Sequence, residues 1–220
     1  MKPATLGFRV HSGWAAMVAV CLEKGAPRVL ARERVQLVET FSYRFRQPYH
    51  TAEKLRLSEA RKFVALVEAE AGRLAERAIH KLQSDLERQG IRATRCGLLL
   101  AAGKTLPNLE KILASHALIH TADGELFREA LLRATKRSGL ATVKIRERQL
   151  LEIGQQALRT DPGALVDRLR ELGRPLGSPW SQDEKFAALA AWLALRGIPK
   201  KIREIPYTAG AAPTPKKATG

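Results

Sequence analysis

The chain is poor in cysteine, in aromatic residues and in long apolar runs. Two cysteines among 220 residues, with no CxxC pair, exclude a disulfide scaffold and predict buried, reduced thiols in a cytoplasmic protein. An aromatic content of 5% argues against an all-β sandwich and favours helices packed on a modest sheet. No stretch approaches 18 consecutive apolar residues and no cleavable leader is recognisable, so we expect no membrane association.

Several catalytic signatures are also missing. There is no HExxH and no GxSxG, and His11 and Ser12 are neighbours that a strand would point to opposite faces. The run LLLAAGKT ends like a phosphate-binding loop, but Gly97 stands one residue too early for the required spacing. Lys104, at the entry to a predicted helix, remains a candidate for contacting an anion.

Basic residues are the most abundant feature. Lys and Arg total 38 against 22 Asp and Glu, a formal net charge of +16. Such a charge predicts a polyanionic partner, DNA or RNA, with a merely solvated basic surface as the alternative.

Hydropathy patterns predict three strands first. An apolar stretch over residues 6–20 is predicted as one buried strand interrupted by the polar notch His11-Ser12-Gly13. Residues 28–38 alternate as a second strand, and residues 40–46 as a third, half-buried one.

Helices and strands then alternate. Apolar residues at 3- and 4-residue steps predict a long helix over 58–89, followed by a strand over 91–102. A second long helix is predicted over 107–138, with Gly124 as a weak point, and a fifth strand over 141–148. The remainder is helical to residue 198, which closes a single domain (1–198), and residues 199–220 are predicted to be a disordered basic tail.

The order β-β-β-α-β-α-β predicts an α/β fold with a mixed five-stranded sheet. It resembles the ribonuclease H-like fold and, within it, the RuvC-type Holliday-junction resolvases. Two segments carry the resemblance: LGFRVHSGWAAMVAV, similar to the family's first strand, and QDEKFAALAAWLAL, similar to its last helix. The resemblance implies carboxylates that converge on divalent magnesium or manganese ions.

The sequence departs from that pattern. Arg9, Val10 and His11 stand where the first carboxylate is expected, the fourth strand has none, and Phe186 replaces a second acidic residue of the last helix. The candidate catalytic residues are therefore Asp183, Glu184, Glu125 and His11. Asp183 and Glu184 have an alternative role, because acidic residues stabilise the first turn of a helix.

A separate cluster suggests a metal. His116, His120 and Asp123 recur at i, i+4 and i+7, so they share one face of a continuous helix and suit a transition metal such as zinc. Surface or hydrogen-bonded core histidines are the alternative.

Basic residues alternate along two predicted strands. With Lys104, the candidate nucleic-acid-binding residues are Arg44, Arg46, Lys144, Arg146 and Arg148. A charged strand edge that prevents aggregation is the alternative.

Three hypotheses of function follow from these observations. The preferred hypothesis is a nucleic-acid-binding ribonuclease H-like protein without standard two-metal nuclease activity. A separate alternative is a metal-dependent phosphodiester hydrolase with a rewired site, which uses His116, His120 and Asp123 with Asp183 as a further candidate. The competing hypothesis is an assembly module in which the apolar stripe of the 58–89 helix forms a homodimer.

Overall fold

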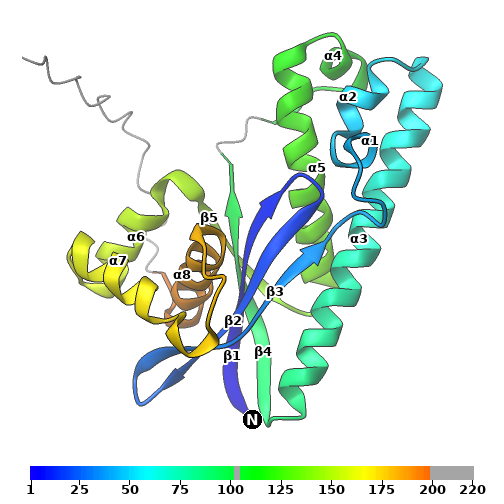
Figure 1. Ribbon diagram of the computed structural model, residues 1–220. Coiled ribbons are helices and arrows are strands. Elements are labelled where there is room, and N and C mark those ends of the chain that lie inside the picture. Colours follow the sequence, from blue (N-terminus) through cyan, green and yellow to red (C-terminus); the bar gives the residue numbers. More distant parts are fainter. Residues whose placement is uncertain (102–104, 199–220) are drawn as a thin grey trace, which may run out of the picture.

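A computed structural model describes residues 1–101 and 105–198, which form one five-stranded sheet covered by helices on both faces (Figure 1). The strand order is β3-β2-β1-β4-β5. The first three strands are antiparallel neighbours, whereas β4 and β5 run parallel to β1. The strands are β1 (Lys2–His11), β2 (Trp14–Glu23), β3 (Ala26–Gln36), β4 (Ile91–Leu100) and β5 (Ala141–Arg146). The predicted mixed α/β sheet is confirmed.

The stretch predicted as one interrupted strand is instead a hairpin. β1 ends at His11, β2 begins at Trp14, and the two strands pair antiparallel along their length. Ser12 and Gly13 form the turn, and Gly13 has a φ of +83°, a conformation that glycine adopts without strain. A two-residue turn of this kind is a hairpin signal, so the prediction of a single strand was wrong.

The two faces of the sheet bury different side chains because neighbouring residues of a strand point to opposite sides. On β2, Met17 and Ala19 pack toward α3 (Leu57–Glu87) and α5 (His116–Arg137), whereas Val18 and Val20 pack toward the C-terminal helices. Those helices are α6 (Leu150–Leu158), α7 (Pro162–Glu171) and α8 (Gln182–Arg196). Figure 1 shows α3 and α5 on one side of the sheet and α6, α7 and α8 on the other.

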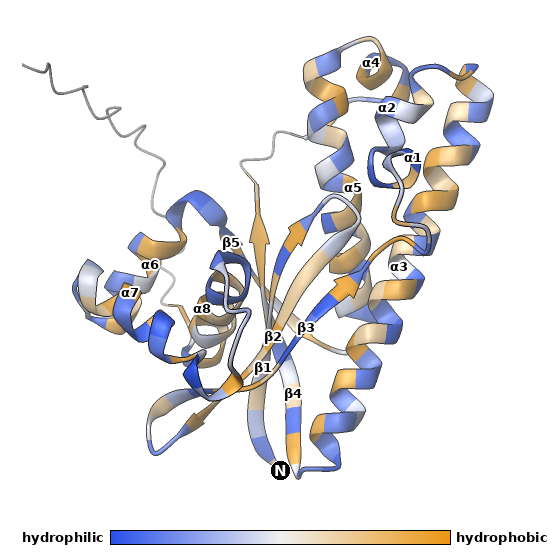
Figure 2. Cartoon of the chain, viewed as in Figure 1, coloured by the Kyte–Doolittle hydropathy of each residue, from blue (hydrophilic) through white to orange (hydrophobic). Residues whose placement is uncertain are grey.

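The apolar stripe of the long helix is used inside the chain. Val64 and Val67 are buried in the core shared with α5 and the sheet, whereas Leu57 and Leu66 of the same helix are exposed. Figure 2 shows hydrophobic and hydrophilic residues alternating around α3, as an amphipathic helix requires. The stripe that was predicted to form a homodimer is therefore covered by the protein itself.

Two further segments differ from expectation. Residues 40–46, predicted as a strand, contain the short helix α1 (Tyr43–Arg46), which is followed by α2 (Pro48–Ala52). The predicted 107–138 helix is two helices, α4 (Leu109–Leu113) and α5, with the break at Ser115, while α5 runs unbroken through Gly124. Figure 1 shows α1, α2 and α4 gathered at one end of the α3–α5 pair.

Two glycines let α8 lie directly on the sheet. A Cβ at Gly7 on β1 would lie 1.8 Å from the carbonyl oxygen of Ala187, and one at Gly97 on β4 would lie 2.2 Å from that of Ala190. The small residues of α8 complete the contact. Ser181 and Glu184 form a capping box, which fixes Gln182 as the first residue of the helix.

Among the described residues, no helix is both long and apolar enough to span a bilayer. The tail predicted over 199–220 lies outside the described residues.

Both cysteines are buried and unpaired. Burial raises the pKa of the Cys96 thiol to about 11, and its hydrogen bond to Thr142 offsets this only in part. Because the thiolate is the reactive form, we expect Cys96 to react with a disulfide reagent at pH 8 at least ~100-fold more slowly than a free cysteine. A colorimetric thiol assay on native and denatured protein tests this; rapid labelling of Cys96 in the native protein would contradict it.

Candidate functional site

A cluster of charged side chains lies where β1 meets the start of α8. Gly7, Arg9 and His11 alternate along β1 and therefore share the face that α8 covers. Further along β1, the larger Arg9 and His11 side chains lie beside the first turn of α8. That turn carries Asp183.

The Arg9 guanidinium uses all three of its nitrogens to hold two carboxylates. Its Nη1 donates to Asp183 Oδ1 at 2.6 Å, while Nη2 and Nε donate to Glu147 Oε1 at 2.6 and 3.1 Å. Glu147 belongs to the short 3-10 helix η1 (Glu147–Gln149) directly after β5. Arg9 is thus a fixed cation between acidic groups from two distant parts of the chain.

Burial alone lowers the pKa of Arg9, but the hydrogen bonds and negative charges of Glu147 and Asp183 outweigh it and raise that pKa above its usual value. The guanidinium is therefore permanently charged. Phe186, one turn into α8, lies under it with 5.1 Å between the guanidinium carbon and the ring centre. This cation–π contact adds to the attraction that holds Arg9 in place. The set of Arg9, His11, Glu147, Asp183 and Phe186 is called the Arg9 centre below.

His11 links the Arg9 centre to the surface. Its Nε2 lies 2.7 Å from Asp183 Oδ1, the oxygen that also accepts from Arg9. On its other side the imidazole stacks on Trp14, with ring centres 4.3 Å apart and planes 11° apart.

The stack continues outward across the hairpin turn. The Arg34 guanidinium lies 3.8 Å from the Trp14 ring centre and 5.6 Å from that of Phe41, which Arg46 covers at 4.4 Å. Phe41 remains 45% exposed. Rings and guanidinium groups thus alternate across the surface. Arg44, on the same short helical segment as Arg46, lies over Phe63 at 5.1 Å. The residues Trp14, Arg34, Phe41, Arg44 and Arg46 are called the hairpin-tip surface.

The Arg9 centre does not fit the magnesium or manganese ions that the family resemblance implies. Two hard divalent cations need several carboxylate oxygens free to coordinate them. Here the two carboxylates of the centre already bind a guanidinium, and an imidazole lies against one of them. A third partner, Phe186, offers a ring where an acidic side chain was expected.

The four candidate catalytic residues separate in the structure. His11 and Asp183 meet in the Arg9 centre, whereas Glu184 accepts from the Ser181 backbone and hydroxyl in the capping box. Glu125 lies elsewhere, paired with Arg128 at 3.0 Å. With Glu129, Lys144 and Arg146 it lines a hollow of about 440 Å³ near the ends of β4 and β5.

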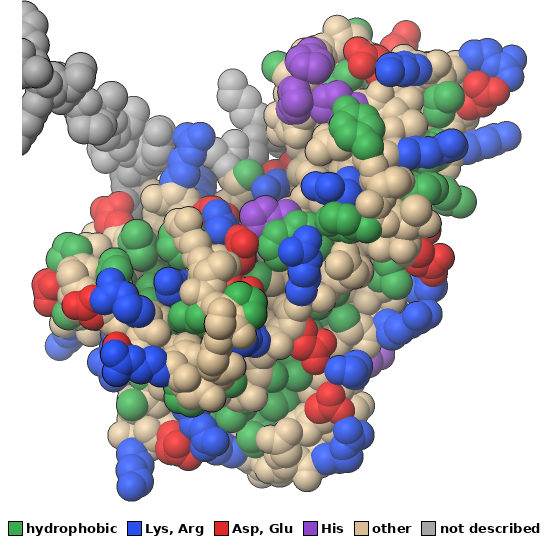
Figure 3. Space-filling view, viewed as in Figure 1, with side chains coloured by type: hydrophobic (Ala, Val, Ile, Leu, Met, Phe, Trp, Pro, Cys, Tyr) green, Lys and Arg blue, Asp and Glu red, His purple; other side chains and the backbone are tan. Residues whose placement is uncertain are grey.

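The candidate nucleic-acid-binding residues fall into two groups. Arg44 and Arg46 belong to α1 beside the hairpin turn, not to a strand as predicted. Lys144 and Arg146 are exposed on β5, and Arg148 follows in η1. Lys104 lies outside the described residues. Figure 3 shows Lys and Arg side chains over much of one face of the molecule, with acidic groups scattered among them.

Two of the three predicted metal ligands lie together in the structure, and the third is replaced by another residue. His116 and His120 lie side by side as the helical spacing predicts, with 3.0 Å between their Nε2 atoms. Asp123 turns away from them: its Oδ1 accepts from the Tyr49 backbone at 2.7 Å and its Oδ2 contacts His50 Nδ1. His50, from α2, takes the third place beside His116 and His120.

Sequence reasoning missed Glu147, Phe186 as a partner of Arg9, and His50. Arg9 was noticed only as a missing carboxylate. The available signal was that Arg9 and Phe186 replace acidic residues together, as a cation and an aromatic ring that attract each other. Nothing in the local sequence links Glu147 to β1 or His50 to α5.

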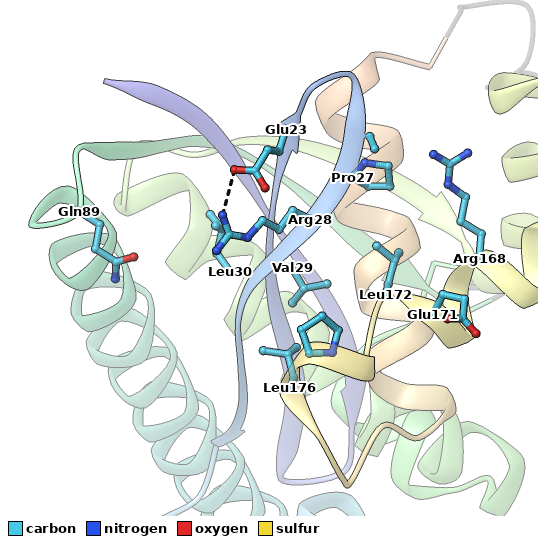
Figure 4. Close-up of a pocket in the computed structure, with 12 residues that line it drawn as sticks. Glu23, Pro27, Arg28, Val29, Leu30, Gln89, Arg168, Glu171, Leu172 and Leu176 are labelled. Atoms are coloured by element: carbon cyan, nitrogen blue, oxygen red, sulfur yellow. Dashed lines mark hydrogen bonds and ion pairs between the residues drawn. The ribbon is translucent and has the colours of Figure 1, made fainter.

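A separate hollow of about 640 Å³ lies at the other end of β2, near the turn before β3 (Figure 4). Ten residues of strand place it roughly 30 Å from the Arg9 centre. Its described lining is mostly apolar, and its Glu23 and Arg28 pair with each other at 3.0 Å. It brings together no set of groups suited to catalysis among the described residues.

The topology, with three antiparallel strands extended by two parallel ones and a last helix on the central strands, is the ribonuclease H-like fold. Solved structures of RuvC Holliday-junction resolvases share it. Thermus thermophilus RuvC in complex with a Holliday junction substrate is 13% identical, and the match covers 88% of this chain and 90% of that one with a TM-score of 0.50. A second structure of RuvC from the same organism is 14% identical, with 86% and 90% covered and a TM-score of 0.45. No family model and no curated protein sequence matches the chain. At 13% identity, the likeness to the junction-bound RuvC establishes the fold alone.

Proposed function

We propose that the protein binds nucleic acid through the hairpin-tip surface and does not cleave it by the two-metal route. The observation that carries the proposal is the Arg9 guanidinium, which lies between Glu147 and Asp183 where a ribonuclease H-like nuclease needs metal ions. A fixed organic cation neutralises the carboxylates but has no open coordination position for a water or a phosphate oxygen. It therefore cannot generate the attacking hydroxide that such metals supply.

The net charge and the aromatic side chains both support the proposal that the protein binds nucleic acid. The net charge of +16 attracts a phosphate backbone, and the arginines beside the exposed Phe41 ring are suited to contacting phosphates and an unpaired base together. The Arg9 centre lies directly behind this surface through the His11–Trp14 stack. Since a RuvC of the same fold is solved with a Holliday junction, branched DNA is the first ligand to try.

Binding is tested with a labelled four-way junction, a matching duplex and a single strand, by fluorescence anisotropy at several salt concentrations. We expect affinity for the preferred probe to fall roughly 10³-fold between 50 and 200 mM salt if six or more phosphates are contacted. Replacing Arg34, Arg44 and Arg46 together with glutamine should lower the slope of log affinity against log salt by about 2 to 3.

The matched control removes the same charge elsewhere, by replacing the exposed Arg77, Arg92 and Arg95 with glutamine. We expect this variant to keep most of the wild-type slope. Equal losses in the two triple variants would mean that only the total charge matters, and binding to none of the probes at low salt would refute nucleic-acid binding altogether.

Cleavage is tested on the same probes with added Mg²⁺ or Mn²⁺. We expect no product above the background of a metal-only control. Cleavage that needs the divalent ion and disappears in Asp183→Asn would refute the absence of nuclease activity while leaving the binding result intact.

A further inference from the structure

Three histidines from two separate helices converge at the helical end of the molecule. His50 lies on α2, and His116 and His120 lie on the first turns of α5. One ring nitrogen of each lies within 4.8 Å of those of the other two. Figure 3 shows histidine side chains gathered at the surface of this end of the molecule.

We propose that His50, His116 and His120 bind a borderline transition-metal ion such as Zn²⁺, with the fourth coordination position open to solvent. Imidazole nitrogens bind such an ion at 2.0–2.1 Å, which places two ligands of a tetrahedral site ~3.3 Å apart. The 3.0 Å between the Nε2 atoms of His116 and His120 is already close to that separation. A small outward movement of these two rings reaches the ligand separation, and the His50 nitrogen lies within 4.8 Å of both.

Asp123 provides an independent reason to regard the cluster as built for a ligand. Its side chain is 2% exposed, and its Oδ2 contacts Nδ1 of His50, whose own side chain is 10% exposed. A carboxylate that accepts from one imidazole nitrogen fixes the tautomer and leaves the other nitrogen, here Nε2, unprotonated for a metal. The Tyr49 backbone N–H donates to the other oxygen of Asp123 and holds the carboxylate in place.

Ligand chemistry selects the class of ion. Three neutral imidazoles suit zinc, copper, nickel or cobalt, whereas magnesium prefers carboxylate and water oxygens. His50 is nearly buried, while His116 and His120 are exposed, so the ion has an entry path from solvent. Because His50 belongs to α2 and the others to α5, the bound ion joins these two helices.

The site is tested on the purified full chain, stripped with a chelator and titrated with Co²⁺ as a spectroscopic substitute for Zn²⁺. We expect a single ion per chain with the intense visible absorption of a tetrahedral site, displaced by Zn²⁺ and unaffected by Mg²⁺. Replacing both His116 and His120 with glutamine should abolish the visible bands; these side chains are exposed, so the fold is preserved.

Two further variants separate a three-histidine site from a simple surface pair. Asp123→Asn, which keeps the shape but not the charge, should weaken binding 10- to 100-fold. His50→Gln should do so more strongly, whereas a pair formed by the α5 histidines alone would bind unchanged in both. His80→Gln on α3, which removes an exposed histidine outside the cluster, should bind as the wild type does. Absence of tetrahedral bands in the wild type, or bands that persist without His116 and His120, would overturn the proposal.

Discussion

Gly7→Ala is expected to destabilise the protein by at least about 3 kcal/mol, or to prevent folding. The new methyl group would lie 1.8 Å from the Ala187 carbonyl oxygen and 2.8 Å from the Ala191 backbone nitrogen. Both atoms belong to the backbone of α8, which has no rotamer to change, so the helix must move off the sheet. Urea unfolding followed by circular dichroism measures the loss.

The matched control is Gly72→Ala, also at a buried glycine. Its methyl group would meet only the end of the flexible Arg137 side chain, at 3.3 Å. Gly72 is in the interior of α3, where alanine is favoured over glycine by up to about 1 kcal/mol. We therefore expect the two substitutions to change stability in opposite directions. A Gly7→Ala variant as stable as the wild type would mean that α8 does not lie where the structure places it.

The order of the strands and the long helices was predicted correctly from the sequence, but two of the first three strands were assigned to the wrong residues. The pattern over 6–20 contains two strands and a turn, and the alternating Phe41, Tyr43 and Phe45 do not form a strand at all. The two errors cancelled, which left three strands before the long helix. Alternation cannot distinguish an exposed aromatic loop from a half-buried strand, because the signal is the same until burial is known. Phe41 and Tyr43 are in fact exposed.

The long helix and the last helix were predictable for local reasons. An apolar stripe along the 31 residues of α3 identifies that segment as a helix, and the capping box identifies the residue at which α8 begins. The break at Ser115 was not predictable in the same way. Asn108 caps α4 by accepting from the Lys111 backbone, which fixes where that helix begins but not where it ends. Ser115 has an extended backbone, with φ of -141° and ψ of 112°, and no local sequence pattern marks this position.

The candidate sites were predictable only in part, because their members come from distant segments. His11 and Asp183 were both singled out, and period-2 alternation places Arg9 on the same face as His11. Glu147 became a partner only through the pairing of β5 with β4, which no local pattern encodes. Likewise, the helical spacing of His116 and His120 was visible, but His50 reaches them through the packing of α2 on α5.

The roles of Asp123 and Arg9 illustrate one principle. Each is a charged group in a place that excludes much water, and such a group needs a partner of opposite charge or a hydrogen bond. Burial raises the pKa of Asp123, and the hydrogen bonds from Tyr49 and His50 act against that rise. Sequence spacing suggested Asp123 as a metal ligand and showed Arg9 only in the place of a carboxylate. The role of each residue follows instead from the partners that it contacts in the structure.

Arg9→Asp is expected to make the stability of the protein depend on a divalent ion. The substitution replaces the central cation with a third carboxylate, beside Glu147, Asp183 and the His11 imidazole. Without metal, three neighbouring carboxylates repel one another, and losing the ion pairs alone costs about 2 kcal/mol at this partly exposed site. Oxygen-rich surroundings of this kind bind Mn²⁺ or Mg²⁺.

Thermal melts with a chelator and with added Mn²⁺ measure the effect. At 100 times the dissociation constant, the ion stabilises the variant by about 2.7 kcal/mol, which raises Tm by roughly 5–10 °C for a chain of this size. Arg9→Gln is the control, since it loses the same ion pairs without adding a carboxylate and should melt alike with and without Mn²⁺. If Arg9→Asp also melts alike under both conditions, the guanidinium does not occupy a cation site. If it alone responds, the protein has kept the geometry of a metal centre and filled it with its own arginine.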